Sequence, residues 1–392
     1  MKLTRQFIDF FNSEKAGGLI LIFCTGFSLV LANSSGGHAY IDFWNSSLAG
    51  HPVQHWINEG LMTVFFLLIG LELEREVYRG ELSRIRNASF PFVAAVGGML
   101  VPAGIYLAFN INTDTQAGVG IPMATDIAFA IGILSLLGSR VPASLKVFVT
   151  AFAVIDDLGA ILIIAFFYTS TLAWSNLLIA MGIFGLLLLF NRLKIHLLLP
   201  YLFGGALMWY FMLNSGVHAT ITGVLLAFAI PFGDGGAKTP SYRLQHFLHR
   251  PVAFFILPLF ALANTGIILG SGWLHSLGSM SSAGIFLGLV AGKPAGIFLF
   301  TLAGSWLGLY SLPKDLKWKH IAGAGLLGGI GFTMSIFISL LAFDQDVLIN
   351  NAKITVLIAS AVSGIIGYFW LGKTLVRNHK EKRLPHIDEA AA

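Results

Sequence analysis

Residues 144–169 read SLKVFVTAFAVIDDLGAILIIAFFYT, and this stretch decides the fold class. Apolar residues run on both sides of Asp156 and Asp157, far enough for an α-helix to cross a hydrocarbon core roughly 30 Å thick. The apolar residues do not alternate with period two, which argues against a membrane β-barrel. The stretch therefore predicts a membrane-spanning helix with two acids near its centre.

The rest of the chain has the same character. Of its 392 residues 56% are hydrophobic and only 11% are charged, and its mean hydropathy is +0.79, which predicts a lipid bilayer as its partner. The net charge of +5 could suggest a nucleic-acid partner, but the basic residues stand singly or in small groups between apolar stretches, so we expect none. Cys24 is the one cysteine, so no disulfide framework is expected.

We predict an all-α polytopic membrane protein with twelve transmembrane helices. Lys and Arg support this number, because short cytoplasmic loops retain them. With both termini in the cytoplasm, 22 of the 24 basic residues fall on the cytoplasmic side. We expect one transporter domain, 1–392, with a cytoplasmic segment 1–16 and a cytoplasmic tail 373–392, and we interpret the first apolar run as a retained helix rather than a signal peptide. The predicted spans are 17–33, 56–78, 88–109, 117–138, 144–169, 174–190, 197–213, 216–231, 251–270, 283–307, 320–343 and 352–372.

Two spans are interrupted by flexible residues. The fourth span contains Gly118, Gly120 and Pro122, and the eleventh contains the run 328–331, which is rich in glycine. Each is the middle member of a group of three spans, 3–5 and 10–12, and the two groups have opposite predicted orientations. This predicts inverted-topology repeats, in which paired interruptions indicate the substrate site of a transporter.

Four ionisable residues lie near the centres of apolar spans: Asp126, Asp156, Asp157 and Lys293. Each costs roughly 2.5–3.5 kcal/mol at the centre of a membrane helix. An ion pair that only joins two helices would account for Lys293 and one aspartate. Two acids then remain, and their negative charge must be neutralised by something mobile.

Protons and small cations are the candidates for this neutralisation. Burial, or a second carboxylate nearby, raises the pKa of a carboxyl group from about 4 toward neutrality. A hard monovalent cation such as Na⁺ or Li⁺ prefers oxygen ligands, which Asp126, Asp156, Asp157 and the hydroxyl of Thr125 supply. If the site can change its exposure only when it is neutralised, competition between proton and cation becomes exchange.

The four charges are expected to divide the work. Asp156 and Asp157 lie about 100° apart around a helix, so one can face the ion site with Asp126 while the other faces a partner such as Lys293. At the broken helices, Asp126 would offset the positive helix ends and Lys293 the negative ends. Lys293 also lies in a glycine ladder, Gly284, Gly288, Gly292 and Gly296, which we interpret as a helix-packing surface.

Several long strings resemble the NhaA family of sodium/proton antiporters. They are ATDIAFA (124–130), IDDLGA (155–160), GKP (292–294), GIGFTMSIF (329–337), WINEGLM (56–62), FFLLIGLE (65–72) and SGVHAT (215–220). The likeness covers nearly the whole chain. The rule that links paired interruptions to a substrate site is itself drawn in part from this family.

The resemblance implies an electrogenic antiporter, not an enzyme, that exports Na⁺ or Li⁺ against protons without a cofactor. It implies a bacterial inner membrane, Asp157 as the main cation ligand with Asp156, Asp126 and Thr125, and Lys293 as the essential lysine. It also implies activation at alkaline pH and a homodimer. The residues that fall on the pH-sensing region are Glu72, Arg75, Glu76, Arg243, His246 and His249, with His218 elsewhere; His218 is alternatively a helix-start residue with a hydrogen bond.

The chain departs from well-known members at a few positions. Glu74 stands where Lys is common, and Tyr242 and Gln245 stand where Lys and Glu are found, which leaves the pH threshold open. The loop from Ser34 to His55 is short for one that forms an intersubunit hairpin, which leaves the dimer interface open.

Three other functions remain in view. One is a different proton-coupled carrier, although an anion carrier should have surplus positive charge at mid-membrane. Another is an intramembrane aspartyl protease, in which Asp126 would join one of the adjacent aspartates. A passive cation channel is the third, and it would not couple the cation to a proton.

Overall fold

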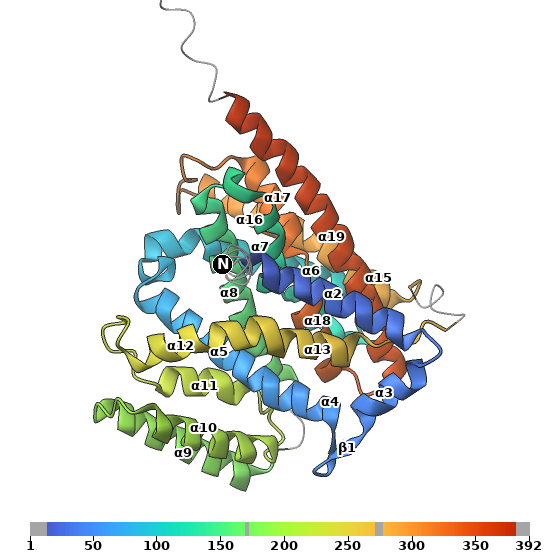
Figure 1. Ribbon diagram of the computed structural model, residues 1–392. Helices are drawn as coiled ribbons and strands as arrows, with labels where there is room; N and C mark the ends of the chain where they lie inside the picture. Colours follow the sequence, from blue (N-terminus) through green and yellow to red (C-terminus); the bar gives the residue numbers. More distant parts are fainter. Residues whose placement is uncertain (1–13, 169–171, 271–276, 382–392) are drawn as a thin grey trace, which may run out of the picture.

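The computed structural model describes residues 14–168, 172–270 and 277–381. This part of the chain is almost entirely helical, with one small antiparallel hairpin in which Ser47 pairs with Pro52 and Leu48 with His51 (Figure 1). The elements of the first half are α2 (Glu14–Ala32), α3 (Gly37–Asn45), β1 (Ser47–Leu48), β2 (His51–Pro52), α4 (Val53–His55), the π-helical turn η1 (Trp56–Leu61), α5 (Met62–Tyr78), η2 (Glu81–Ser83), α6 (Ile85–Asn110), the 3₁₀ helix η3 (Gln116–Met123), α7 (Ile127–Leu136), η4 (Gly138–Arg140) and α8 (Ala143–Phe167).

The second half continues the same architecture. In Figure 1, α9 and α10 lie side by side at one edge, and the long α19 runs across the other side of the molecule. The elements are α9 (Trp174–Arg192), α10 (Leu198–Leu213), α11 (Ile221–Ala229), α12 (Pro240–Pro251), the π-helical turn η5 (Val252–Ile256), α13 (Leu257–Thr265), α15 (Met280–Leu287), the π-helical turn η6 (Gly288–Gly292), α16 (Lys293–Trp306), α17 (Trp318–Gly328), α18 (Phe332–Ala342) and α19 (Asp346–Glu381).

Within the described residues, eight helices are long and apolar enough to cross a membrane. Two further spans are possible if bent helix pairs are counted, and these are α2 with α3, at 113°, and α17 with α18, at 45°. The prediction of an all-α membrane protein is therefore confirmed, but the number twelve is not reached by length alone. The predicted spans 197–213 and 216–231 correspond to α10 and to the nine-residue α11, both too short for that criterion.

The ninth predicted span has the wrong start. Residues 240–250, expected in a cytoplasmic loop, form α12, which continues through η5 into α13. Pro240 suits the first helical position because its missing N–H is not needed there. Leu244 and Leu248 are buried one turn apart, so packing of one face outweighs the polar character of the segment.

The prediction that the glycine ladder packs against another helix is confirmed. A side chain at Gly284 would meet Tyr106 of α6, and one at Gly292 would meet Pro102 of the same helix. At Gly296 the backbone of α16 touches the carbonyl of Gly97. Small residues on both helices thus bring α6 against the continuous helix formed by α15, η6 and α16.

Candidate functional site

The two interrupted spans meet inside the protein, as their flexible residues predicted. In the fourth span the 3₁₀ helix η3 ends at Met123, residues 124–126 are extended, and α7 starts at Ile127. In the eleventh span α17 ends at Gly328 and α18 starts at Phe332. The amide N–H of Asp126 donates to the Ile330 carbonyl over 2.7 Å, so the two breaks bond to each other. We call this region, 124–126 with 328–333, the crossing.

Asp126 lies at two helix starts within the crossing. Its Oδ1 accepts from the Phe129 amide, 2.9 Å away, in the first turn of α7. Its Oδ2 accepts from the amide of Thr333 at 3.0 Å and from its hydroxyl at 2.5 Å, in the first turn of α18. The carboxylate thus satisfies donors at the positive ends of two half-helices, the geometry expected for charge compensation.

Lys293 follows the π-helical turn η6 and is completely buried. Its Nζ donates to the carbonyl of Met123, the last residue of η3 and hence a negative helix end. The same Nζ lies 2.8 Å from Asp156 Oδ2. One of the adjacent aspartates therefore pairs with Lys293, and that aspartate is Asp156.

Thr125 links the crossing to this ion pair. Its hydroxyl lies 2.7 Å from Asp156 Oδ2 and 3.0 Å from the Gly328 carbonyl, and it can donate to one of them at a time. Both side chains are buried. Thr125 therefore joins the end of α17 to the middle of α8.

Asp157 is equally buried, with 1% of its surface exposed, but it is bonded differently. Among the described residues, Asp157 Oδ1 and Asp156 Oδ1 are buried oxygens with no hydrogen-bond donor. Asp157 interacts electrostatically with Asp156, Asp126 and Lys293. A buried carboxylate oxygen without a donor costs free energy, which a cation or a proton can recover.

The four predicted ligands are not gathered into a tight cage. In the described part of the chain, no three side chains of His, Cys, Asp or Glu lie close enough together to hold a metal ion. The structure brings Thr125, Asp156 and Lys293 into contact, and Asp126 is occupied by the helix starts. A cation bound here would therefore take oxygens from Asp157 and Asp156 first.

Six of the proposed pH-sensing residues lie on two neighbouring helices, α5 and α12. His249 Nδ1 is 3.8 Å from Glu72 Oε1. The guanidinium carbon of Arg75 stands 5.3 Å from the centre of the Tyr242 ring, which stacks on His246 at 6.1 Å. Glu76 and Arg243 lie on the same two helices.

Glu74, one of the positions that departs from the family, faces α12. It is 3% exposed, and its Oε2 accepts a hydrogen bond from the Ser241 hydroxyl over 3.1 Å. A lysine at this position could not accept that bond. The departure at Glu74 is thus matched by a hydroxyl on the facing helix.

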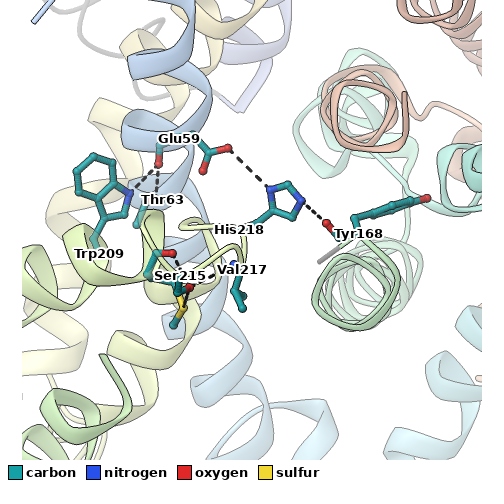
Figure 2. Close-up of polar contacts among 8 residues, drawn as sticks. Glu59, Thr63, Tyr168, Trp209, Ser215, Val217 and His218 are labelled. Atoms are coloured by element: carbon teal, nitrogen blue, oxygen red, sulfur yellow. Dashed lines mark hydrogen bonds and ion pairs between the residues drawn. The ribbon is translucent and has the colours of Figure 1, made fainter. Parts of the chain in front are cut away.

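His218 lies far along the chain from this cluster, just before α11 (Figure 2). Its Nε2 is 2.9 Å from the Tyr168 carbonyl, and its Nδ1 is 3.9 Å from Glu59 Oε1. The hydrogen-bonded interpretation of His218 is thus met. The sequence did not single out Glu59, the carboxylate beside it, because Glu59 stands near the start of an apolar span, where charged residues are common.

A polar cavity of about 570 Å³ lies beside Glu59, at the end of the molecule that holds the hairpin. Three buried polar atoms in its wall, Trp44 Nε1, His55 Nε2 and Glu59 Oε2, have no hydrogen-bond partner among the described residues. Lys353, 6% exposed, also lines the cavity. Unpaired buried polar atoms around such a volume indicate that it holds water.

Comparisons with known proteins identify the family of this chain. Residues 8–371 match the family model described as Na⁺/H⁺ antiporter 1. Three similar proteins are each named Na(+)/H(+) antiporter NhaA. The protein of Flavobacterium psychrophilum is 65% identical over 96% of this chain and 98% of its own length. That of Dechloromonas aromatica is 60% identical over 94% and 96%, and that of Vibrio parahaemolyticus is 48% identical over 95% and 98%. The chain therefore belongs to the Na⁺/H⁺ antiporter 1 family, the NhaA antiporters.

Proposed function

We propose that this antiporter binds Na⁺, Li⁺ or a proton at Asp157 and Asp156, with Thr125 and Asp126 in support, and moves them across the membrane by alternating access. As a member of its family, the protein is a Na⁺/H⁺ antiporter and spans a bacterial membrane several times. It is not an enzyme and uses no cofactor. The observation that carries the proposal is the pair of buried carboxylate oxygens without donors on adjacent residues of α8.

The exchange follows from competition for these oxygens. In the state described, Asp156 is held by Lys293 and Thr125, while Asp157 has an unbonded oxygen. A cation that enters would bind Asp157 and draw Asp156 away from Lys293, because both carboxylates are hard oxygen ligands. Protonation of Asp157 would release the cation, and the ionised Asp156 would then return to Lys293 and Thr125.

The compensating charges make this cycle possible in lipid. Asp126 stays bonded to the two helix starts, and Lys293 stays bonded to the Met123 carbonyl, so neither half-helix end loses its partner when the ion leaves. Net export of one Na⁺ against more than one H⁺ makes the transport electrogenic, as the family resemblance implies.

Alternating access requires a path to each side. The polar cavity at the hairpin end supports one path, which we assign to the periplasm. Phe337 lines this cavity and packs on Phe66 and Phe260, with ring centres 5.5 and 6.4 Å apart. These rings would separate the cavity from the ion site in the present conformation.

We further propose twelve spans, of which spans 3–5 and 10–12 form inverted repeats, with both termini in the cytoplasm and 1–392 as one transporter domain. The eight long helices, α2, the α17–α18 pair, α10 and α11 supply the twelve segments, and the side on which 22 of 24 basic residues fall supports the orientation. Residues 1–13 of the N-terminal segment and 382–392 of the tail lie outside the described residues.

For regulation, we propose that the α5–α12 cluster of Glu72, Arg75, Glu76, Arg243, His246 and His249 senses cytoplasmic pH. The ion pair of Glu72 with His249 forms only while the histidine is protonated, so alkaline pH weakens the contact between the helices. His218, whose Nδ1 lies 3.9 Å from Glu59 Oε1, is proposed as a further member of the pH-sensing set.

A homodimer is also proposed. Two apolar residues are exposed in and next to the short hairpin: Leu48 of β1 at 57% and Phe43 of α3 at 58%. Cross-linking of a cysteine at position 48 in native membranes should give dimers, and monomers alone would contradict the dimer.

Transport in vesicles tests the proposed function. In inverted membrane vesicles with an acid interior, added Na⁺ or Li⁺ should collapse the proton gradient, and Asp157→Asn should abolish this response. Asp114→Asn, the same substitution at an exposed position between α6 and η3, is the matched control and should keep the response. A gradient indifferent to both cations in the unmodified protein would contradict the proposal.

A further inference from the structure

A second, apolar crevice of about 440 Å³ opens between α2, α7 and α19. Phe129, Phe332 and Ser360 line it, together with residues that are partly exposed at its mouth: Ile22 at 44%, Leu136 at 43% and Phe369 at 61%. Almost all of its surface is apolar. It shares no residue with the polar cavity or with the ion ligands.

The crevice extends through half of the membrane. Within the span Asp346–Leu375, Ser360 lies near the middle and Phe369 near one end. Phe129 and Leu136 likewise lie at the start and the end of α7. The crevice thus runs from mid-membrane to the surface at which α7 ends.

Hydrocarbon surrounds the mouth of this crevice. The outward faces of α2 and α19 expose large apolar side chains, such as Phe23 at 70% and Ile366 at 42%, which in a membrane protein contact acyl chains. An open apolar crevice in that position is filled by the hydrocarbon of the bilayer that lies at its opening. The occupant of matching chemistry is therefore a lipid chain.

Charge at one end of the crevice complements a phospholipid. Lys373, one helical turn beyond Phe369 on α19, is exposed. Arg140, in η4 just after α7, is also exposed, and η4 contacts α19. A phosphate at this membrane surface would have both cations nearby.

We propose that this crevice binds one acyl chain of a bilayer phospholipid whose phosphate faces Arg140 and Lys373, and that the bound lipid supports the crossing of the broken helices. The crevice differs from the rest of the lipid-facing surface, because its inner wall consists of side chains that adjoin the two breaks.

Two contacts connect the inner wall to the crossing. The Phe129 amide donates to Asp126, and the Phe332 amide donates to the Ser360 hydroxyl over 3.1 Å. The rings of Phe129 and Phe332 pack edge to face with centres 5.0 Å apart. A chain in the crevice packs on both rings, whereas an empty crevice leaves them without contacts on one side.

A photoactivatable phospholipid with a diazirine in the middle of one acyl chain tests the site. With the full-length protein in bilayers, we expect labelling of α19 near residues 361–369 that saturates as the labelled fraction of lipid rises. Ala361→Trp fills the crevice and should reduce this labelling at least about tenfold, since each methylene removed from burial weakens binding roughly fourfold.

The matched control is Ile366→Trp, which adds the same side chain at a position 42% exposed on α19 that does not line the crevice. It should leave the labelling unchanged. If Ala361→Trp fails to fold, Ala361→Leu replaces it. Labelling that rises without saturation, or that is equal in both tryptophan variants, overturns the proposal, as does finding the crevice covered by a second copy in cross-linked dimers. The readout is binding, so it does not depend on transport.

Discussion

The crossing and the middle of α8 are both buried in the membrane interior, and both hold carboxylates, but they treat these carboxylates in opposite ways. At the crossing, both oxygens of Asp126 accept hydrogen bonds from two helix starts. In α8, Asp156 and Asp157 each keep one buried oxygen without a donor among the described residues. The difference separates a carboxylate that is hydrogen-bonded through both oxygens from carboxylates with an unbonded oxygen, which we propose as the ion ligands.

The largest expected effect is the separation of transport from stability at Asp157. Asp157→Asn should remove exchange completely, because a neutral amide can neither take up a proton nor offer a negative charge to a cation. The free energy of unfolding should change by less than about 1 kcal/mol, since no hydrogen bond to the Oδ1 oxygen is lost. Gradient collapse and thermal melting of the same purified protein measure both. A variant that unfolds readily would erase the contrast with Asp126.

Lys293 comes next, because it bonds to both regions. Lys293→Ala leaves Asp156 buried without its cation and should cost about 3–5 kcal/mol of stability. Lys293→Arg keeps the charge and should be more stable than Lys293→Ala. Melting temperatures decide this, and equal values for the two variants would count against the assignment of Lys293 to charge compensation.

A smaller stability loss is expected at the crossing. Asp126→Asn keeps one accepting oxygen, so donors of either Phe129 or Thr333 lose their acceptor, at about 1–3 kcal/mol. The loss should exceed that of Asp157→Asn in the same melting assay. The reverse order would show that Asp126 does not hold the two helix starts together.

The smallest effect concerns pH. His249→Ala removes an ion pair whose histidine is 67% exposed, and such pairs contribute about 0.2–1 kcal/mol. The midpoint of alkaline activation should therefore move by less than about one pH unit, toward lower pH, because a contact present on the acid side is lost. His196→Ala, between α9 and α10, is the control. If the pH profile of transport shifts equally in His249→Ala and His196→Ala, the α5–α12 cluster does not regulate the antiporter.

Sequence patterns predicted those features that depend on composition and spacing. Glycine and proline in the fourth and eleventh spans predicted the breaks. The buried charges led to the prediction that Lys293 offsets negative helix ends and Asp126 positive ones, and in the structure Lys293 contacts the carbonyl of Met123 and Asp126 accepts from two helix starts. The 100° separation around α8 predicted that one aspartate would face Lys293. It did not tell which, because that depends on how α8 is rotated against α16.

Features that depend on tertiary packing were not predictable. The polar segment before Pro251 lacks a strong helical signal, and only the burial of Leu244 and Leu248 makes it helical. Glu59 and Lys353 stand near the ends of apolar spans, where charges are common, so their shared cavity became visible only with the fold. The polar cavity and the apolar crevice are both made by helices far apart in sequence.

The glycine contacts between α6 and α16 limit how this antiporter can move. Backbones that touch at Gly97 and Gly296 have no layer of side chains between them that could slide or change rotamer. Lys293, at the start of α16, must then move together with α6 as one rigid body. The motion that turns the ion toward the opposite membrane surface has to occur along other helix boundaries, while α6 and α16 keep their contact.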